Sequence, residues 1–200
     1  MKNYLLSLLS FSILISTSWA QGTKATENFN SFLRKNLKYP SELRTNEIKG
    51  PVSMLIEFDQ EGKINSAPEV LAGNENLAEE IIRVLHQLES ENKTELVAED
   101  YFGQELILNV NFKITSGNSQ QIKLPISEEK IWKDLNQKIS QNPYFPAHYL
   151  ERARFYEELE KTTLAELDRA FYQKLKETEM TDIVVVGYQT SHKKLSRASE

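Results

Sequence analysis

The first half of the chain changes from a helical to an extended spacing of its hydrophobic positions. Residues 26–38 carry an apolar stripe at i, i+3, i+4 and i+8, formed by Phe29, Phe32, Leu33 and Leu37. This spacing predicts a short amphipathic helix, and Tyr39-Pro40 predicts its end, because a proline disfavours helical backbone in the residue before it. From residue 48 to 58 the even positions are apolar and the odd ones mostly polar, which is the period of a half-buried strand.

The following residues predict a hairpin, a second helix and a closing strand. Asp59 and Gly62 stand at the first and fourth positions of a tight turn, so we expect residues 63–71 to pair back onto the first strand. Residues 75–89 place their apolar side chains on one helical face. The closing strand alternates apolar and polar positions, and its apolar members are Leu106, Leu108, Val110, Phe112 and Ile114. Over residues 26–115 this order predicts an α+β fold, in which a small antiparallel sheet packs on two helices.

Four short motifs in this region stand in an order that is typical of one family. They are Tyr39-Pro40, Gly50-x-Val52, Phe58-Asp59-x-x-Gly62-Lys63-Ile64 and Asn111-Phe112-Lys113-Ile114. Together they resemble the C-terminal domain of TonB over residues 29–115. The resemblance implies that partner proteins bind by adding an extended strand to the sheet edge. It also implies that the strand 106–114 is the partner-binding edge. The implied partner is a TonB-dependent outer-membrane receptor or a TonB energy transducer.

The first twenty residues have the pattern of an export signal. Lys2 precedes an apolar run over residues 4–15, and small residues follow at Ser18 and Ala20. This pattern predicts a secretory signal peptide, residues 1–20, cleaved between Ala20 and Gln21, and therefore a periplasmic protein. The alternative is an uncleaved membrane anchor. We favour cleavage because the run is short for a spanning helix.

The second half predicts a polar linker at 116–126 and a helical segment at 127–177. Ser127 is a predicted N-cap, followed by two acidic residues and an apolar stripe up to Asn142-Pro143. Thr163-x-x-Glu166 is a predicted capping box for the last helix. Residues 143–176 resemble one tetratricopeptide repeat, with Glu160 in place of its glycine, through Tyr149, Arg152, Ala153, Tyr156, Leu159, Ala165 and Asp168. Two interpretations remain open: a peptide-binding groove, or a plain three-helix subdomain, since a solenoid needs about three repeats.

The C-terminal tail, residues 178–200, contains a run of β-branched residues that favours extended backbone. Its core is Asp182, Ile183, Val184, Val185, Val186, Gly187 and Tyr188. Residues 182–190 resemble the N-terminal box of TonB-dependent outer-membrane receptors. The tail is therefore expected to pair with the strand 106–114, within one chain or between two copies, or to be offered to a different TonB. The plainer alternative is a final strand of the protein's own core.

Charge and composition exclude several classes of function. The 200 residues carry a net charge of −5, which argues against a nucleic-acid partner, and they include no cysteine, which excludes thiol chemistry, disulfides and Cys-ligated metals. The three histidines, His86, His148 and His192, lie far apart and in no metal-ligand motif. No nucleophile elbow, P-loop or dinucleotide fingerprint is present. We therefore expect no catalytic residue, metal or cofactor, and a protein that is not an enzyme.

These observations predict a periplasmic protein that acts by protein–protein recognition in TonB-dependent transport across the outer membrane. Strand addition is the expected mode of binding. The alternative is a tetratricopeptide-type adaptor or assembly factor, in which the TonB-like fold is a scaffold and residues 143–176 bind the partner.

Overall fold

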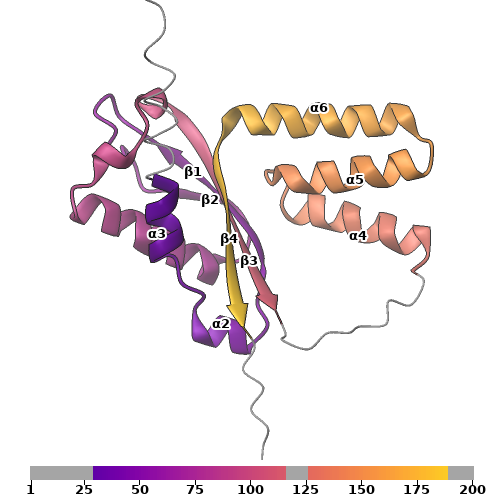
Figure 1. Cartoon of the computed structure of the whole chain (residues 1–200), viewed down its shortest axis with the longest axis horizontal. Helices are drawn as coiled ribbons and strands as arrows, with labels where there is room; N and C mark the ends of the chain where they lie inside the picture. Colours follow the sequence, from indigo (N-terminus) through magenta and orange to yellow (C-terminus); the bar gives the residue numbers. More distant parts are fainter. Residues whose placement is uncertain (1–28, 116–125, 189–200) are drawn as a thin grey trace, which may run out of the picture.

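The structure is a computed structural model that describes residues 29–115 and 126–188 (Figure 1). The predicted signal peptide with its cleavage site at Ala20 and Gln21, most of the linker and the end of the tail lie outside the described residues.

The first part of the chain contains both helices and strands, and helices dominate the second. A helix over residues 29–36 is followed by α2 (Ser41–Thr45), β1 (Gly50–Glu57), β2 (Glu69–Ala72) and α3 (Glu75–Ser90). Two short 3₁₀ turns, Thr94–Leu96 and Glu99–Tyr101, lead to β3 (Glu105–Thr115). Then come α4 (Glu128–Gln141), α5 (Pro146–Glu158), α6 (Thr162–Thr178) and β4 (Glu179–Tyr188).

One four-stranded sheet, in the order β2-β1-β3-β4, organises the described residues. Strand β1 is antiparallel to both β2 and β3, whereas β4 is parallel to β3. The predicted α+β fold is therefore confirmed in its general form, and the strands within 29–115 are antiparallel as predicted, but the addition of β4 makes the sheet mixed. The reason is the crossover through α4, α5 and α6, which returns the chain to the end of the sheet where β3 begins (Figure 1).

The second predicted strand, over residues 63–71, is wrong in its bounds. The turn forms as predicted, since the Gly62 amide donates to the Asp59 carbonyl at 3.1 Å. Ile64 then makes only an isolated bridge with Phe58, and the strand proper begins at Glu69. Pro68 lies between them and has no amide hydrogen for the ladder, which accounts for the delayed start.

The main hydrophobic core lies between one face of the sheet and the helices 29–36 and α3. In Figure 1 these helices lie on one side of the sheet, and α4, α5 and α6 lie on the other. The largest fully buried side chains come from both layers and include Phe29, Leu33, Met54, Ile81, Leu108 and Phe112. Helix α3 turns one continuous apolar face to this core, as its spacing predicts, and Asn74 caps its start by accepting from the Leu77 amide.

The helical segment, α4 to α6, has a much smaller core of its own, formed by Leu135, Phe155, Tyr156 and Ala165. Ser127 caps α4 as predicted, and its hydroxyl accepts from the Lys130 amide at 3.4 Å. The predicted capping box at Thr163 is wrong, because α6 already begins at Thr162 and has no side-chain cap. Helix α6 runs directly into β4 without an intervening loop.

Candidate functional site

The site predicted from the sequence is the junction of β3 and β4, which we call the seam. The two strands pair from Leu108 with Thr181 to Thr115 with Tyr188 in continuous register. Four of the five predicted edge residues turn their side chains into the core, namely Leu106, Leu108, Val110 and Phe112, whereas Ile114 is half-buried. Strand β3 also pairs with β1 on its other side. It is therefore an internal strand, and the expected pairing of the tail with the strand 106–114 within one chain is present.

The tail residues occupy the edge that was predicted for a partner. In β4 the side chains alternate, so that Ile183 and Val185 are buried in the core. Val184, Val186 and Tyr188 lie on the opposite face, and Tyr188 is 66% exposed. Because both faces are apolar in sequence, the alternation was not visible before the structure. The outer face of β4 therefore exposes apolar side chains to solvent.

A glycine at the end of β4 closes the seam against an aromatic ring. A Cβ atom built on Gly187 lies 2.7 Å from Cδ2 of Tyr39, so only glycine fits without displacement. The Tyr39 ring is held in place, because its hydroxyl donates to the Ile48 carbonyl at 2.6 Å. Its ring also packs edge-on against Phe112, with centroids 5.5 Å apart. The Tyr-Pro motif of the first helix and the glycine of the tail thus meet directly.

The start of β4 is fixed by polar contacts. The Tyr101 hydroxyl donates to the Met180 carbonyl at 3.1 Å, and Asn109 Nδ2 donates to the buried Glu179 carboxylate at 2.7 Å. Glu179 also pairs with Lys176 of α6. Burial raises the pKa of Asp182, and the neighbouring Glu179 carboxylate raises it further, whereas Lys176 and Lys113 lower it. Both the beginning and the end of the strand are therefore held by specific contacts.

A chain of hydrogen bonds extends from β4 across the outer face of the sheet to the helical segment. Ser53 Oγ donates to Asn109 Oδ1 at 2.5 Å, and Asn142 Nδ2 donates to Ser53 Oγ at 2.9 Å. All three side chains are buried. Sequence reasoning missed them, because Ser53 and Asn109 stand at alternate strand positions that indicated a solvated face, and Asn142 stands at the end of a helix. A buried polar group needs a partner, so each of these residues depends on the others.

A shallow hollow of about 360 Å³ lies beside the seam. It is bordered by Val184 to Tyr188 of β4 and by three basic residues near the first helix, Arg34, Lys38 and Arg44. The outer edge of β4 is one of two terminal edges of the sheet, the other being β2. This arrangement offers main-chain groups and apolar side chains to an extended segment.

The two histidines of the described residues lie on different helices. His86 is exposed on α3, next to Glu89, His148 is buried on α5, and His192 lies outside the described residues. No group of three or more His, Asp or Glu side chains within 29–115 and 126–188 is arranged to hold a metal ion. Of the helices within these ranges, none has both the length and the apolar character to cross a bilayer.

Comparison of the chain with protein-family models, with curated proteins and with solved structures found no match. The likeness to the TonB C-terminal domain and to receptor boxes thus rests on the motifs quoted above.

Proposed function

We propose that this protein is a recognition module of TonB-dependent transport that binds by strand addition, and that its own tail occupies the receiving edge. A receptor or a transducer then binds either in place of β4 along β3 or at the outer edge of β4. Periplasmic export and a TonB-like character of the sheet unit are parts of the same proposal.

The contact of Gly187 with Tyr39 is the observation that carries this proposal. Residues 182–190 resemble a receptor box, and the domain they pair with resembles the module that such boxes bind. The tail lies along β3 with its glycine against the tyrosine of the Tyr-Pro motif. Main-chain pairing supplies affinity in strand addition, and a residue that must be glycine supplies selectivity.

A free peptide has to compete with a tail that is covalently attached. The tether gives β4 an effective concentration on the order of millimolar at its site, so a partner at micromolar concentration does not displace it. Burial of Ile183 and Val185 adds to this advantage. Binding in place of the tail is therefore expected only once β4 has been released.

The test is a full-length double variant, Ile183→Asp with Val185→Asp. Both carboxylates would be buried in the docked strand but solvated in the released one, so the tail leaves the sheet. The probe is a labelled peptide with the sequence of residues 179–190, followed by fluorescence anisotropy. The matched control, Val184→Asp with Val186→Asp, adds the same charge on the exposed face.

The release variant is expected to bind the peptide saturably, while the wild type and the control variant bind it at least tenfold more weakly. A peptide in which Gly187 is replaced by leucine is expected not to bind. If the release variant stays folded by circular dichroism and ignores the peptide, the strand-exchange form of the proposal is wrong. If the release variant unfolds, the full-length variant Gly187→Leu replaces it in the test. This single change is expected to release the tail, because the leucine side chain collides with the Tyr39 ring.

One observation favours the adaptor as a second candidate. Leu164, Leu167 and Phe171 form a partly exposed apolar stripe along α6, in which the Phe171 ring stacks on Tyr149 of α5. An adaptor would lose its partner on Leu167→Ser with Phe171→Ser, whereas strand addition at the seam would be unaffected by these changes.

A further inference from the structure

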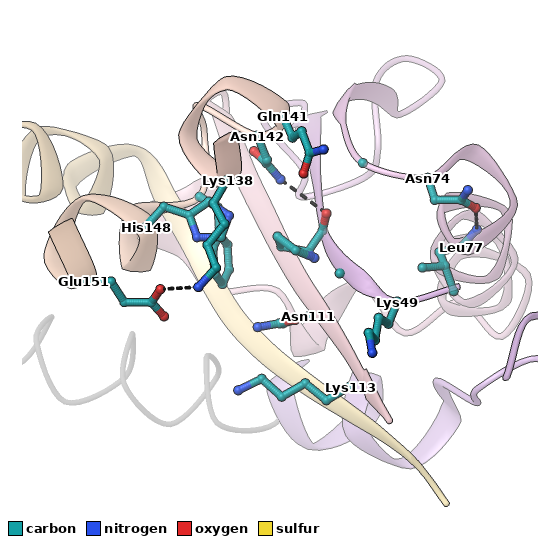
Figure 2. A pocket seen from close by; sticks show the side chains of 14 residues that line it. Lys49, Asn74, Leu77, Asn111, Lys113, Lys138, Gln141, Asn142, His148 and Glu151 are labelled. Carbon is teal, nitrogen blue, oxygen red and sulfur yellow. Dashed lines mark hydrogen bonds and ion pairs between the residues drawn. The ribbon is translucent and has the colours of Figure 1, made fainter. Parts of the chain in front are cut away.

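A groove of about 750 Å³ separates the outer face of the sheet from the helical segment (Figure 2). Its walls come from distant parts of the sequence: the beginning of β1, the outer face of β3, the start of α3, and the ends of α4 and α5 that face the sheet. The buried contact of Asn142 with Ser53 holds the two walls together at one end. The volume is that of a site for a small organic molecule. Two of its lining residues, Asn111 and Lys113, belong to β3 of the seam, and the exposed stripe of α6 is not part of it.

The charge of this groove is opposite to that of the whole protein. Lys49, Lys113 and Lys138 line it, together with a single carboxylate, Glu151. Glu151 is already paired with Lys138 at 2.7 Å, as Figure 2 shows. Lys49 and Lys113 make no ion pair with any residue in the described ranges. Asp182 is nevertheless close enough to Lys113 for the lysine charge to lower the pKa of its carboxyl group. In a chain of net charge −5, three lysines against one lining carboxylate are a local excess of positive charge.

The deeper lining of the groove is apolar and contains a buried histidine. Leu77 and Phe145 are buried, and the Phe145 ring lies against the His148 ring with centroids 4.9 Å apart. His148 is only 6% exposed, and its Nδ1 has no hydrogen-bond partner among the described residues. Such a buried polar atom normally has a partner, so the site is incomplete as it stands. Burial also lowers the pKa of His148 to about 4, which keeps the ring neutral at physiological pH.

The chain segment that connects the two walls does not complete the groove by charge. Residues 116–125 carry one charged side chain, Lys123, and no acidic residue. Among the described residues that line the groove, Glu151 is the only acid, so the lining favours a bound group of negative charge. A cationic rim above an apolar floor is complementary to an acid group on an apolar body.

We propose that this groove binds a small organic anion, a carboxylate or phosphate attached to an apolar chain. Lys49 and Lys113 supply the charge that attracts its acid group, and Pro51 and the exposed edge of Phe145 lie against its apolar part. The inference does not depend on the proposed function, because strand addition uses the main chain of the seam, whereas the groove uses the side chain of Lys113 and residues outside the seam.

The test is a titration of the full chain with probes that separate charge from apolar character. Decanoate and decyl phosphate have both an acid group and an apolar chain. Decanol has the chain without a charge, decyltrimethylammonium has the chain with a positive charge, and acetate has the acid group without the chain. The readouts are calorimetry and the NMR shifts of the His148 ring. Decanoate or decyl phosphate is expected to bind saturably and to move these shifts, at least tenfold more tightly than the three other probes. The stronger of the two identifies the acid group.

The matched variants are Lys49→Gln with Lys113→Gln, and the control Lys130→Gln with Lys133→Gln on the exposed side of α4. Loss of two charge-assisted contacts is expected to weaken binding about tenfold or more, while the control changes it less than twofold. If decanol binds as tightly as decanoate, or if both double variants behave like the wild type, the proposal is wrong. The probe series on the unmodified protein decides the question even if a variant fails to fold.

Discussion

The sheet unit and the helical segment are stabilised in different ways. The sheet buries a continuous apolar core that extends from Phe29 to Val185. The helical segment buries four hydrophobic side chains in its own cluster and adds an ion pair in which Arg152 donates two hydrogen bonds to Asp168, each 2.7 Å long. Arg152 also donates to Asn136 Oδ1, which ties α4 to the α5–α6 pair. Packing of apolar side chains therefore stabilises most of the sheet unit, whereas directional polar contacts carry a larger share of the stability of the helical segment.

The largest expected effect is in the sheet core. Phe112→Ala removes a fully buried ring that supports Tyr39 and is expected to lower the free energy of unfolding by about 3–5 kcal/mol. Leu135→Ala in the small helical cluster is expected to cost about 2–3 kcal/mol and to act mainly on α4 to α6. Urea unfolding followed by circular dichroism and by Trp132 fluorescence measures both. Equal losses in the two probes for Leu135→Ala would contradict the division between the two units.

Breaking the ion pair tests the polar side of the comparison. Asp168→Asn leaves the Arg152 guanidinium mostly buried and without its anion, at a cost of about 2–3 kcal/mol in unfolding free energy. Glu157→Gln removes the exposed partner of Arg169 and is the control, with an expected cost below about 0.5 kcal/mol. Thermal unfolding of both variants is the measurement. Similar costs would mean that the buried pair contributes no more than a surface one.

Stability is expected to fall as the pH is lowered through the range where histidine titrates. The pKa of His148 is depressed to about 4 in the folded protein, whereas the unfolded chain binds the proton near the ordinary value of 6.5. Protons therefore favour the unfolded state between these values, and the loss from about pH 7.5 to about pH 5.5 amounts to about 1 kcal/mol. His148→Gln is expected to remove this part of the pH dependence. An unchanged slope in that variant would assign the effect to other groups.

The smallest expected effect is a gain in stability. Glu160 follows α5 with a φ of 57°, in the left-handed region, at the place where a tetratricopeptide repeat has glycine. Glu160→Gly relieves this conformation, and the greater freedom of glycine in the unfolded chain offsets part of the gain, so we expect about 0.5 kcal/mol of stabilisation. Glu158→Gly, in the helical part of α5, is the control and is expected to destabilise. A loss at both positions would mean that Glu160 makes a contact worth more than its strain.

The elements with regular periodicity were predictable from the sequence, and the contacts between distant elements were not. Helix α3 follows its apolar spacing closely, because one face of it is buried in the core. The alternating apolar positions of β3 also face this core, although Ile107 and Asn109 on its other face are buried as well. The position of β4 depends on a crossover of three helices, and no local pattern encodes a parallel partner. Ser53, Asn109 and Asn142 are of residue types that are usually exposed, and their burial follows only from the docking of the helical segment.

The direct passage from α6 into β4 has a mechanical consequence. A force that pulls on the residues after Tyr188 acts along the strand axis, so the bonds between β3 and β4 are loaded in shear and resist together. Once they fail, the 17 residues of α6 are the next to yield. Their extension from about 25 Å as a helix to about 60 Å as an extended chain would lengthen the molecule, while β1, β2 and β3 remain paired.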